Sequence, residues 1–266
     1  MIDNKQVIAI IFAGGSGKRL NQSANIQNLD KLPKQFLHVN GIPIIIHTLG
    51  IFQFNDTVDK IYVAIHPNYV DYIQDLVKEY RITKVAGIVK GADTALGSQL
   101  NALELAEREN PENSIVLIHD GVRPNISQTT LQNCIDCVVK NGNAITCTNC
   151  FETGIISKDG SKIDNVPVRK ETYLAQAPQG FLLGELIKVH REILKTKPTY
   201  EDLVDSCSMY NFLGKNIFIS KGNIGNIKIT TIEDLYLLRA YLRYNEDKNI
   251  AQSGEEILRK YENKGE

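Results

Sequence analysis

The chain has 266 residues, of which 42% are hydrophobic and 23% are charged, a composition typical of a folded globular protein. This length suits one α/β domain with an appendage. The net charge of −1 gives no reason to expect nucleic acid as a partner, so local basic groups are expected to face a small anionic ligand. No apolar run approaches the roughly 18–20 residues that a membrane-spanning helix needs, so no membrane partner is expected.

The predicted elements begin with an apolar run, Val7 to Ala13, typical of a strand buried on both faces. It leads directly into Gly14-Gly15-Ser16-Gly17-Lys18-Arg19. Glycines allow a close approach of the backbone to a ligand, and consecutive N–H groups can then point at an anion. Lys18, Arg19 and, after a long polar loop, Lys34 add positive charge. This region predicts a phosphate site, with a tight turn between a strand and a helix as the alternative.

Strands and helices then alternate as far as residue 139, which predicts a doubly wound, mostly parallel α/β sheet. The predicted strands are Lys60–Ile65, Thr83–Val89 and Ser114–His119. The predicted helices open at Pro43 and cover Asn68–Tyr80, Gly97–Arg108 and Leu131–Val139. Because the carboxyl ends of parallel strands share one edge of the sheet, residues that follow these strands are candidates for a ligand site.

Beyond residue 140 the pattern becomes rich in β-structure. A strand-like stretch at 143–150 is followed by two β-rich runs around Lys158-Asp159-Gly160-Ser161, which is a hairpin signal. Residues 151–177 therefore predict a projecting β-arm that serves dimerisation. The remaining predicted elements are helices at Leu183–Leu194, Tyr200–Tyr210 and Thr231–Tyr244, and short strands at 216–220 and 226–229.

The C-terminal residues 246–266 are highly charged, and we expect either a helix from Ser253 to Tyr261 or a disordered tail. The main domain is therefore expected to span 1–245. Five cysteines and the absence of a secretory signal before the first strand favour reduced thiols and a cytoplasmic location. Cys134/Cys137 and Cys147/Cys150 have CxxC spacing, but they lie in helical and strand-like patterns, so buried thiols are expected rather than zinc.

A second group of chemically capable residues lies in His119-Asp120-Gly121-Val122-Arg123-Pro124. Asp120 ends a buried strand, where a carboxylate can hold Mg²⁺ against a phosphate, and Arg123 can fix a second ligand group. The alternative for Asp120 is a turn cap, and His119 is expected to be structural. Lys228 would bring a further cation to the same edge if its segment returns there.

Five stretches in matching order make the chain resemble the cytidylyltransferases that act on polyol phosphates, as far as about Leu242. That family includes the methylerythritol-phosphate enzymes of isoprenoid synthesis and the ribitol-5-phosphate enzymes of teichoic-acid and capsule synthesis. The resemblance implies a Rossmann-like nucleotidyltransferase sheet with a projecting β-arm. The matching stretches are Ala13–Arg19, Pro33–Leu37, Ile118–Pro124, Gln176–Phe181 and Asn226–Thr231 with Glu233–Leu235.

The resemblance also implies a role for each matching residue. The catalytic residues, which stabilise charge at the α-phosphate of CTP, would be Arg19, Lys34 and Lys228. The polyol phosphate would be bound by Asp120, Arg123, Thr153 and Arg169, the last of which would reach the substrate of the neighbouring subunit. Asp120 would also lie near Mg²⁺. CTP itself would be bound by Ala13, Gly14, Gly15, Ser16, Gly17, Lys18, Gly91, Ala92 and Ser98.

The activity implied is the transfer of CMP from CTP to a polyol phosphate, with release of pyrophosphate and no protein nucleophile. Val204-Asp205-Ser206-Cys207 departs from the usual Thr-Asp-Glu-Ala, and together with Ile229–Thr231 it looks closer to the ribitol-phosphate branch. We therefore expect D-ribitol 5-phosphate first, giving CDP-ribitol for cell-surface polymers, and 2-C-methyl-D-erythritol 4-phosphate second. The rival readings are a catalytically silent nucleotide-binding module and a sugar-1-phosphate nucleotidyltransferase that uses UTP or dTTP.

Overall fold

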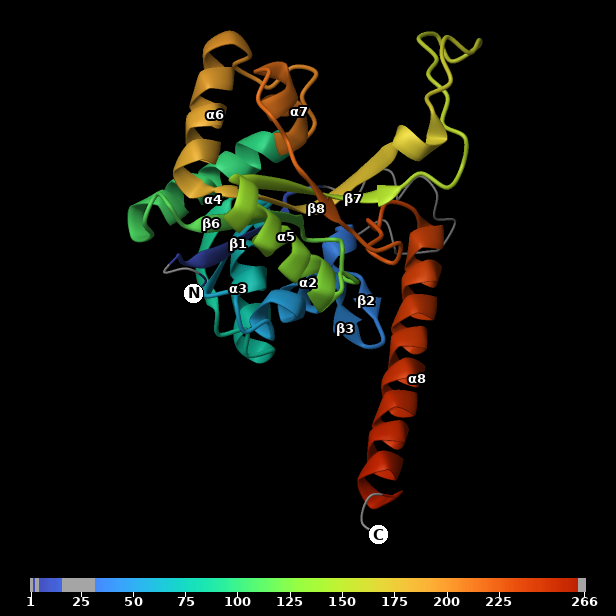
Figure 1. Cartoon of the computed structure of the whole chain (residues 1–266). Coiled ribbons are helices and arrows are strands. Elements are labelled where there is room, and N and C mark those ends of the chain that lie inside the picture. Colours follow the sequence, from blue (N-terminus) through green and yellow to red (C-terminus); the bar gives the residue numbers. More distant parts are fainter. Residues whose placement is uncertain (1, 3–4, 16–31, 263–266) are drawn as a thin grey trace.

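A seven-stranded sheet with the strand order β5-β4-β1-β6-β8-β7-β9 organises the protein (Figure 1). The computed structural model describes the chain apart from residues 1, 3–4, 16–31 and 263–266. The strands of the sheet are β1 (Val7–Ala13), β4 (Lys60–Ile65), β5 (Val85–Lys90), β6 (Ile115–Asp120), β7 (Asn143–Asn149), β8 (Tyr173–Leu182) and β9 (Ile219–Lys221). A separate small ribbon joins β2 (His38–Val39) to β3 (Ile42–Pro43).

Most strands of the large sheet run in one direction. β5, β4, β1 and β6 are parallel neighbours, and β9 is parallel to β7. β8 alone among these strands is reversed, because it pairs antiparallel with both β6 and β7. The predicted doubly wound, mostly parallel sheet is therefore confirmed.

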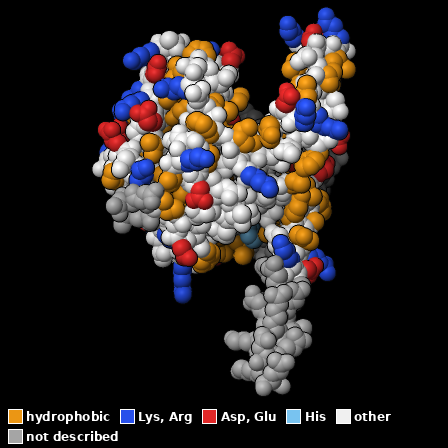
Figure 2. Space-filling view, in the orientation of Figure 1, with side chains coloured by type: hydrophobic (Ala, Val, Ile, Leu, Met, Phe, Trp, Pro, Cys, Tyr) orange, Lys and Arg blue, Asp and Glu red, His pale blue; other side chains and the backbone are white. Residues whose placement is uncertain are grey.

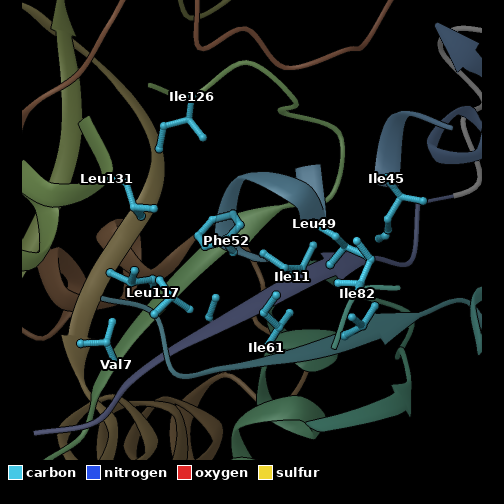
Figure 3. Packing of buried hydrophobic residues seen from close by; sticks show 14 of the residues in the cluster. Val7, Ile11, Ile45, Leu49, Phe52, Ile61, Ile82, Leu117, Ile126 and Leu131 are labelled. Carbon is cyan, nitrogen blue, oxygen red and sulfur yellow. The ribbon is translucent and has the colours of Figure 1, made fainter. Parts of the chain in front are cut away.

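Helices cover both faces of the sheet. β1 is apolar at every position and points alternate residues to opposite sides, so each of its faces can be buried under helices. Val7, Ala9 and Ile11 pack in the cluster that contains α2 (Ile44–Gln53), α3 (Val70–Glu79) and α5 (Gln128–Asn141), shown in Figure 3. Ile8 and Ile10 pack in the opposite cluster, with α4 (Ala95–Glu109), α6 (Leu183–Thr196) and α7 (Ser206–Phe212). Short 3₁₀ turns occur at Lys34–Phe36, Pro67–Tyr69 and Arg169–Glu171.

The last helix, α8 (Ile232–Glu262), is longer than the sequence predicts. Its first turns pack Leu235 and Leu238 against Ile44 and Val122, and its second half leaves the body of the protein (Figure 1). The prediction of a helix that ends at Tyr244 was therefore wrong, whereas the helix expected from Ser253 to Tyr261 is confirmed as part of α8. No helix within the described ranges is long and apolar enough to cross a membrane.

Two further predicted elements differ in the structure. The helix expected from Tyr200 begins only at Ser206, because Tyr200 and Asp202 have φ angles of 59° and 63°, which a helix does not allow. Asp205 then caps α7 by accepting a hydrogen bond from the Ser208 N–H. The strand expected at 226–229 was also wrong, because this segment joins no ladder and is held by separate hydrogen bonds.

The predicted β-arm leaves the sheet after β7 and returns through β8 (Figure 1). Its hairpin pairing is reduced to one isolated bridge between Ile156 and Asn165. The arm carries many exposed apolar side chains, and Figure 2 shows them gathered along it. They are Phe151, Ile155, Ile156, Ile163, Val166, Val168, Tyr173 and Leu174, each between 45% and 61% exposed. Dimerisation through the arm stays a prediction.

Candidate active site

The ends of β1 and β6 form the base of the candidate site. Phe12 and Asp120 are register partners, and the Gly121 N–H donates to the Phe12 carbonyl oxygen at 2.9 Å. A Cβ at Gly121 would lie 2.8 Å from the Cβ of Ala13, so only glycine lets the turn approach the end of β1 this closely. The turn after β6 is therefore held beside the start of the glycine loop, as the sheet order predicted.

Asp120 forms ion pairs with two side chains, Arg123 in the same turn and Lys228 in a distant segment. Its Oδ2 lies 2.7 Å from Nε of Arg123, and its Oδ1 lies 2.5 Å from Nζ of Lys228. The carboxylate is 8% exposed, so burial by itself would raise its pKa, but the Lys228 ammonium and the Arg123 guanidinium outweigh burial and lower the pKa to about 2. Asp120 therefore stays ionised and fixes both cations at the edge of the sheet.

The segment before α8 brings Lys228 to this edge. Ile229 N–H donates to the Val122 carbonyl oxygen at 2.9 Å, and Arg123 Nη1 donates to the Asn226 carbonyl oxygen at 3.0 Å. Asp234 holds the end of the segment by accepting from the N–H groups of Thr230 and Thr231. The segment does return to the edge, so the condition for Lys228 to act there is met, although the segment does not form a strand.

Lys34 reaches the same edge of the sheet as Lys228, from a different segment of the chain. Its Nζ donates to the Ile229 carbonyl oxygen at 2.7 Å. The adjacent Gln35 is 1% exposed and donates from Nε2 to the Ala13 carbonyl oxygen at 2.8 Å. These two bonds place the second basic turn against both the first strand and the Lys228 segment, so residues from three distant stretches meet.

A hollow of about 230 Å³ lies between these basic groups, and we call it the loop-side hollow. Its wall includes Ala13, Gly14, Gly15, Lys34, Ala92, Ser98, Asp120 and Lys228. Ser98 shapes one side, since its Oγ accepts from the Ala92 N–H at 2.9 Å and donates to the Thr94 carbonyl oxygen at 2.9 Å. Gly91 lies behind this turn, where a Cβ would come within 3.0 Å of Ser98 Oγ.

A second hollow of about 200 Å³ adjoins the first, and we call it the strand-side hollow. The two share Phe12, Ala95, Asp120 and Lys228 in their walls. The strand-side hollow adds Arg123, residues 175–177 of β8, and three polar residues that the sequence analysis did not assign to the site, Gln99, Gln179 and Asp205. Asp205 and Gln179 lay within or beside the family motifs, but Gln99 carried no sequence signal, since a glutamine in a helix is ordinary.

The other predicted site residues fall into two groups. Ser16, Gly17, Lys18 and Arg19 lie outside the described residues. Thr153 and Arg169 are exposed on the arm, and neither is among the described residues that line the two hollows. Their contacts with substrate stay predictions.

The described residues contain no group of three or more His, Cys, Asp or Glu side chains placed to hold a metal ion. Cys134 is buried and burial raises the pKa of its thiol to about 12, while Cys137 and Cys150 are half-buried. Neither CxxC pair therefore joins a metal cluster in this part of the chain. Asp120 is the buried carboxylate at the two hollows, which suits an ion that arrives with phosphate ligands of its own.

The family model and the relatives that match this chain are all named as cytidylyltransferases. The family model described as 2-C-methyl-D-erythritol 4-phosphate cytidylyltransferase (IspD) matches residues 7–244. A ribitol-5-phosphate cytidylyltransferase of Streptococcus agalactiae serotype V is 37% identical over 91% of this chain and 98% of its own. Another of that name from Vibrio parahaemolyticus is 35% identical, with the same coverage of both chains.

A 2-C-methyl-D-erythritol 4-phosphate cytidylyltransferase of Syntrophus aciditrophicus is 33% identical, again over 91% of this chain and 98% of its own. Among solved structures, the 4-diphosphocytidyl-2C-methyl-D-erythritol synthase of Anaerococcus prevotii has a TM-score of 0.75 and 28% identity, covering 91% of this chain and 98% of that one. The likeness thus extends over the sheet, the arm and both hollows.

Proposed function

Because the chain belongs to the 2-C-methyl-D-erythritol 4-phosphate cytidylyltransferase (IspD) family, we propose that it transfers CMP from CTP to D-ribitol 5-phosphate and releases pyrophosphate. It is a cytidylyltransferase, and the open question is the polyol. Support for ribitol 5-phosphate comes from the relatives of that name, which are 35–37% identical, whereas those named for methylerythritol phosphate are 32–33% identical. CDP-ribitol would serve the synthesis of cell-surface polymers.

The observation that carries the proposal is the cation cluster around Asp120, shared by two adjoining hollows. The reaction needs two anionic substrates side by side, with an oxygen of one phosphate in line with the α-phosphorus of the other. CTP would occupy the loop-side hollow, against the glycines and Ser98. The polyol phosphate would occupy the strand-side hollow, where Arg123 is available, and Lys228 lines both.

The chemistry asks the protein to orient the substrates and to stabilise charge. A phosphate oxygen of the polyol phosphate attacks the α-phosphorus of CTP, a new P–O bond forms, and the bond to pyrophosphate breaks. Lys34 and Lys228 would contact the α-phosphate as its negative charge increases, together with Arg19. Asp120 would hold Lys228 and Arg123 in place, so the cations need not reorganise during the reaction.

We further propose that Mg²⁺ enters with CTP. Mg²⁺ prefers one or two carboxylates together with substrate phosphates, and Asp120 offers one buried carboxylate at the shared wall of the hollows. When bound, the ion would shield phosphate charge and draw electron density from the phosphate oxygens. Because both oxygens of Asp120 already bind cations, the phosphates would supply most of the ligands.

We also propose that two copies pair through the arm in the cytoplasm. An isolated hairpin is at best marginally stable in water, and this arm exposes eight large apolar side chains. A two-fold contact would cover this surface with a second copy of itself. Thr153 and Arg169, which are not among the described residues that line either hollow, could then act in the partner's site.

The experiment that tests the activity is a pyrophosphate-release assay with CTP and a panel of polyol phosphates. Release with D-ribitol 5-phosphate, and CDP-ribitol as the product by mass spectrometry, would support the proposal. Release only with 2-C-methyl-D-erythritol 4-phosphate would assign the chain to isoprenoid synthesis instead. CTP binding without release from any member of the panel would favour a catalytically silent module.

A further inference from the structure

The strand-side hollow contains polar groups beyond those that the phosphate chemistry requires. Arg123 and Lys228 supply positive charge at its wall, whereas Gln99, Gln176, Gln179 and Asp205 carry amide and carboxylate groups. A carboxylate repels phosphate, so the phosphate of a bound substrate belongs with Arg123 and Lys228. The remaining polar groups must then face another part of the substrate or serve only the fold.

Two of the three glutamines serve the fold. Gln179 donates from Nε2 to Asp205 Oδ2 at 2.9 Å and accepts from the Cys207 N–H at 3.2 Å. Gln176 donates to the Asn223 carbonyl oxygen at 3.2 Å and accepts from Asn226 Nδ2 at 3.4 Å. Both ends of each amide are therefore occupied by the protein, and neither is left for a ligand.

Gln99 differs from these two. It lies on α4, is only 1% exposed, and accepts a hydrogen bond at Oε1 from the Ser206 hydroxyl at 3.2 Å. Its Nε2 donates no hydrogen bond to any residue within the described ranges. This nitrogen is not among the fully buried unpaired atoms of the described residues, so it is open to the strand-side hollow, where a polar ligand group can accept its hydrogen bond. Because Ser206 is itself fully buried at the first position of α7, it holds the amide in one orientation.

Asp205 supplies a complementary acceptor at the same hollow. Its Oδ1 accepts from the Ser208 N–H at 2.8 Å and its Oδ2 from Gln179, which leaves each oxygen able to accept one more hydrogen bond. A hydroxyl group is the ligand that suits this pair, since it can accept from an amide N–H and donate to a carboxylate. If the Gln99 amide is turned over, a hydroxyl still satisfies it by donating.

We propose that Gln99 and Asp205 bind hydroxyl groups of the polyol chain, and that Gln99 determines the preference for a long hydroxylated chain. Ser206 acts as a positioning residue that orients the Gln99 amide. This inference rests on the proposed function, because it takes a polyol phosphate as the occupant of the strand-side hollow. A substrate with an apolar group in place of the hydroxyl leaves Gln99 unpaired, which lowers the rate for that substrate by roughly 10- to 100-fold.

The test compares Gln99→Met, which keeps the length of the side chain and removes its hydrogen bonds, with the unmodified enzyme. The substrates are CTP with D-ribitol 5-phosphate, D-erythritol 4-phosphate or glycerol 3-phosphate, which lose one hydroxylated carbon at a time. We expect Gln99→Met to lower kcat/KM for ribitol 5-phosphate roughly 10- to 100-fold. The shorter substrates should lose much less, and KM for CTP should not change.

Two further variants keep the test decisive. Ser206→Ala removes the hydrogen bond that orients the Gln99 amide. It should lower kcat/KM for ribitol 5-phosphate relative to the shorter substrates, by a smaller factor than Gln99→Met does. If Gln99→Met does not fold, this variant tests the role of Gln99 instead. Gln132→Met is the matched control, because Gln132 lies on another helix and its partners are Thr57 and Asp136. This control should leave the ratio between substrates as it is.

The outcomes separate the two proposals. An equal loss for all three polyol phosphates, or no loss, in an enzyme that uses ribitol 5-phosphate overturns the role of Gln99 and leaves the proposed function standing. An unmodified enzyme that accepts only a methyl-branched substrate, or none, overturns both. A selective loss for ribitol 5-phosphate with an unchanged KM for CTP supports both.

Discussion

Lys228 Nζ lies 2.5 Å from Asp120 Oδ1, which ties the segment before the last helix to the end of a buried strand in the first half of the chain. The same carboxylate binds Arg123 through its other oxygen. One anion thus holds two cations at the place where two hollows meet. We expect this arrangement to position charge for the reaction more than to stabilise the fold, since the Lys228 side chain is 40% exposed.

The first prediction concerns Asp120→Asn, which keeps the shape and removes the charge. The variant should lose turnover by roughly 100-fold or more, because Lys228 and Arg123 lose the group that fixes them. The rate should also require a higher Mg²⁺ concentration. Steady-state rates in a Mg²⁺ titration check both points. Glu107→Gln, which removes a carboxylate paired with Arg191 on the surface, is the control and should behave as the parent. A normal rate and a normal Mg²⁺ requirement would make Asp120 only a turn residue.

The second prediction concerns Lys34→Met. We expect a loss of roughly 100- to 1000-fold in kcat with little loss of thermal stability, because Lys34 would contact charge that develops at the α-phosphate. Lys84→Met is a matched control, since Lys84 also donates to a backbone carbonyl oxygen, that of Asn55, away from both hollows. Equal kcat values for the two variants would remove Lys34 from the catalytic residues. Kinetics and thermal unfolding of both proteins are the measurements.

The third prediction is a loss of stability in mild acid. Burial lowers the pKa of His119 to about 4 and that of His190 to about 3. The unfolded chain therefore binds more protons than the folded chain below about pH 6.5, so the free energy of unfolding falls as the pH decreases from there toward 4. Each histidine contributes on the order of 1.4 kcal/mol per pH unit in this window.

Urea unfolding across this pH range measures the effect. His119→Asn should reduce the slope, because it removes one of the two buried histidines. Activity should show no step from His119, whose ring stays neutral at ordinary pH and makes a 3.1 Å contact from Nε2 to the Arg123 carbonyl oxygen. A His119→Asn slope equal to that of the parent would contradict the assignment of this acid sensitivity to His119.

The fourth prediction tests a site shared between two copies. Inactive Arg169→Ala chains mixed with inactive Lys34→Ala chains should regain activity, because one hybrid site would hold both native side chains. Lys34→Ala mixed with Lys228→Ala should regain none, since these two residues line the same hollow of one chain. Light scattering should show a dimer at micromolar concentration. Confirmed mixed dimers without activity would exclude the shared site but not the cytidylyltransferase activity.

The fifth prediction concerns the end of α8. The family match stops at residue 244, and the buried residues of the helix, among those whose side chains are described, are Leu235 and Leu238 in its first turns. A chain ended after Asn245 should therefore keep its kcat and its cooperative unfolding. A loss of turnover without unfolding in this shortened chain would show that the terminal part of the helix acts on the site.

The sequence by itself determined the first strands of the sheet and the family of the protein. β1 and β4 have the predicted bounds, because a run of buried apolar residues between polar flanks is a local signal. The glycines, Lys34, Asp120, Arg123 and Lys228 could be recognised because phosphate chemistry needs those side chains and the five motifs occur in order. The cytidylyltransferase family followed from the same motifs.

The tertiary structure decided what depends on distant contacts. Local sequence patterns do not predict that Lys228 pairs with Asp120, that residues 226–229 form no strand, or that α7 begins only at Ser206. These arise where hydrogen bonds to other segments, such as Ile229 to Val122, outweigh the local preference for a strand or helix. The role of Gln99 also depends on distant contacts, because a glutamine within a helical pattern does not indicate a binding site. Only the packing of α4 against α7 pairs one end of its amide with Ser206 and leaves the other end without a partner among the described residues.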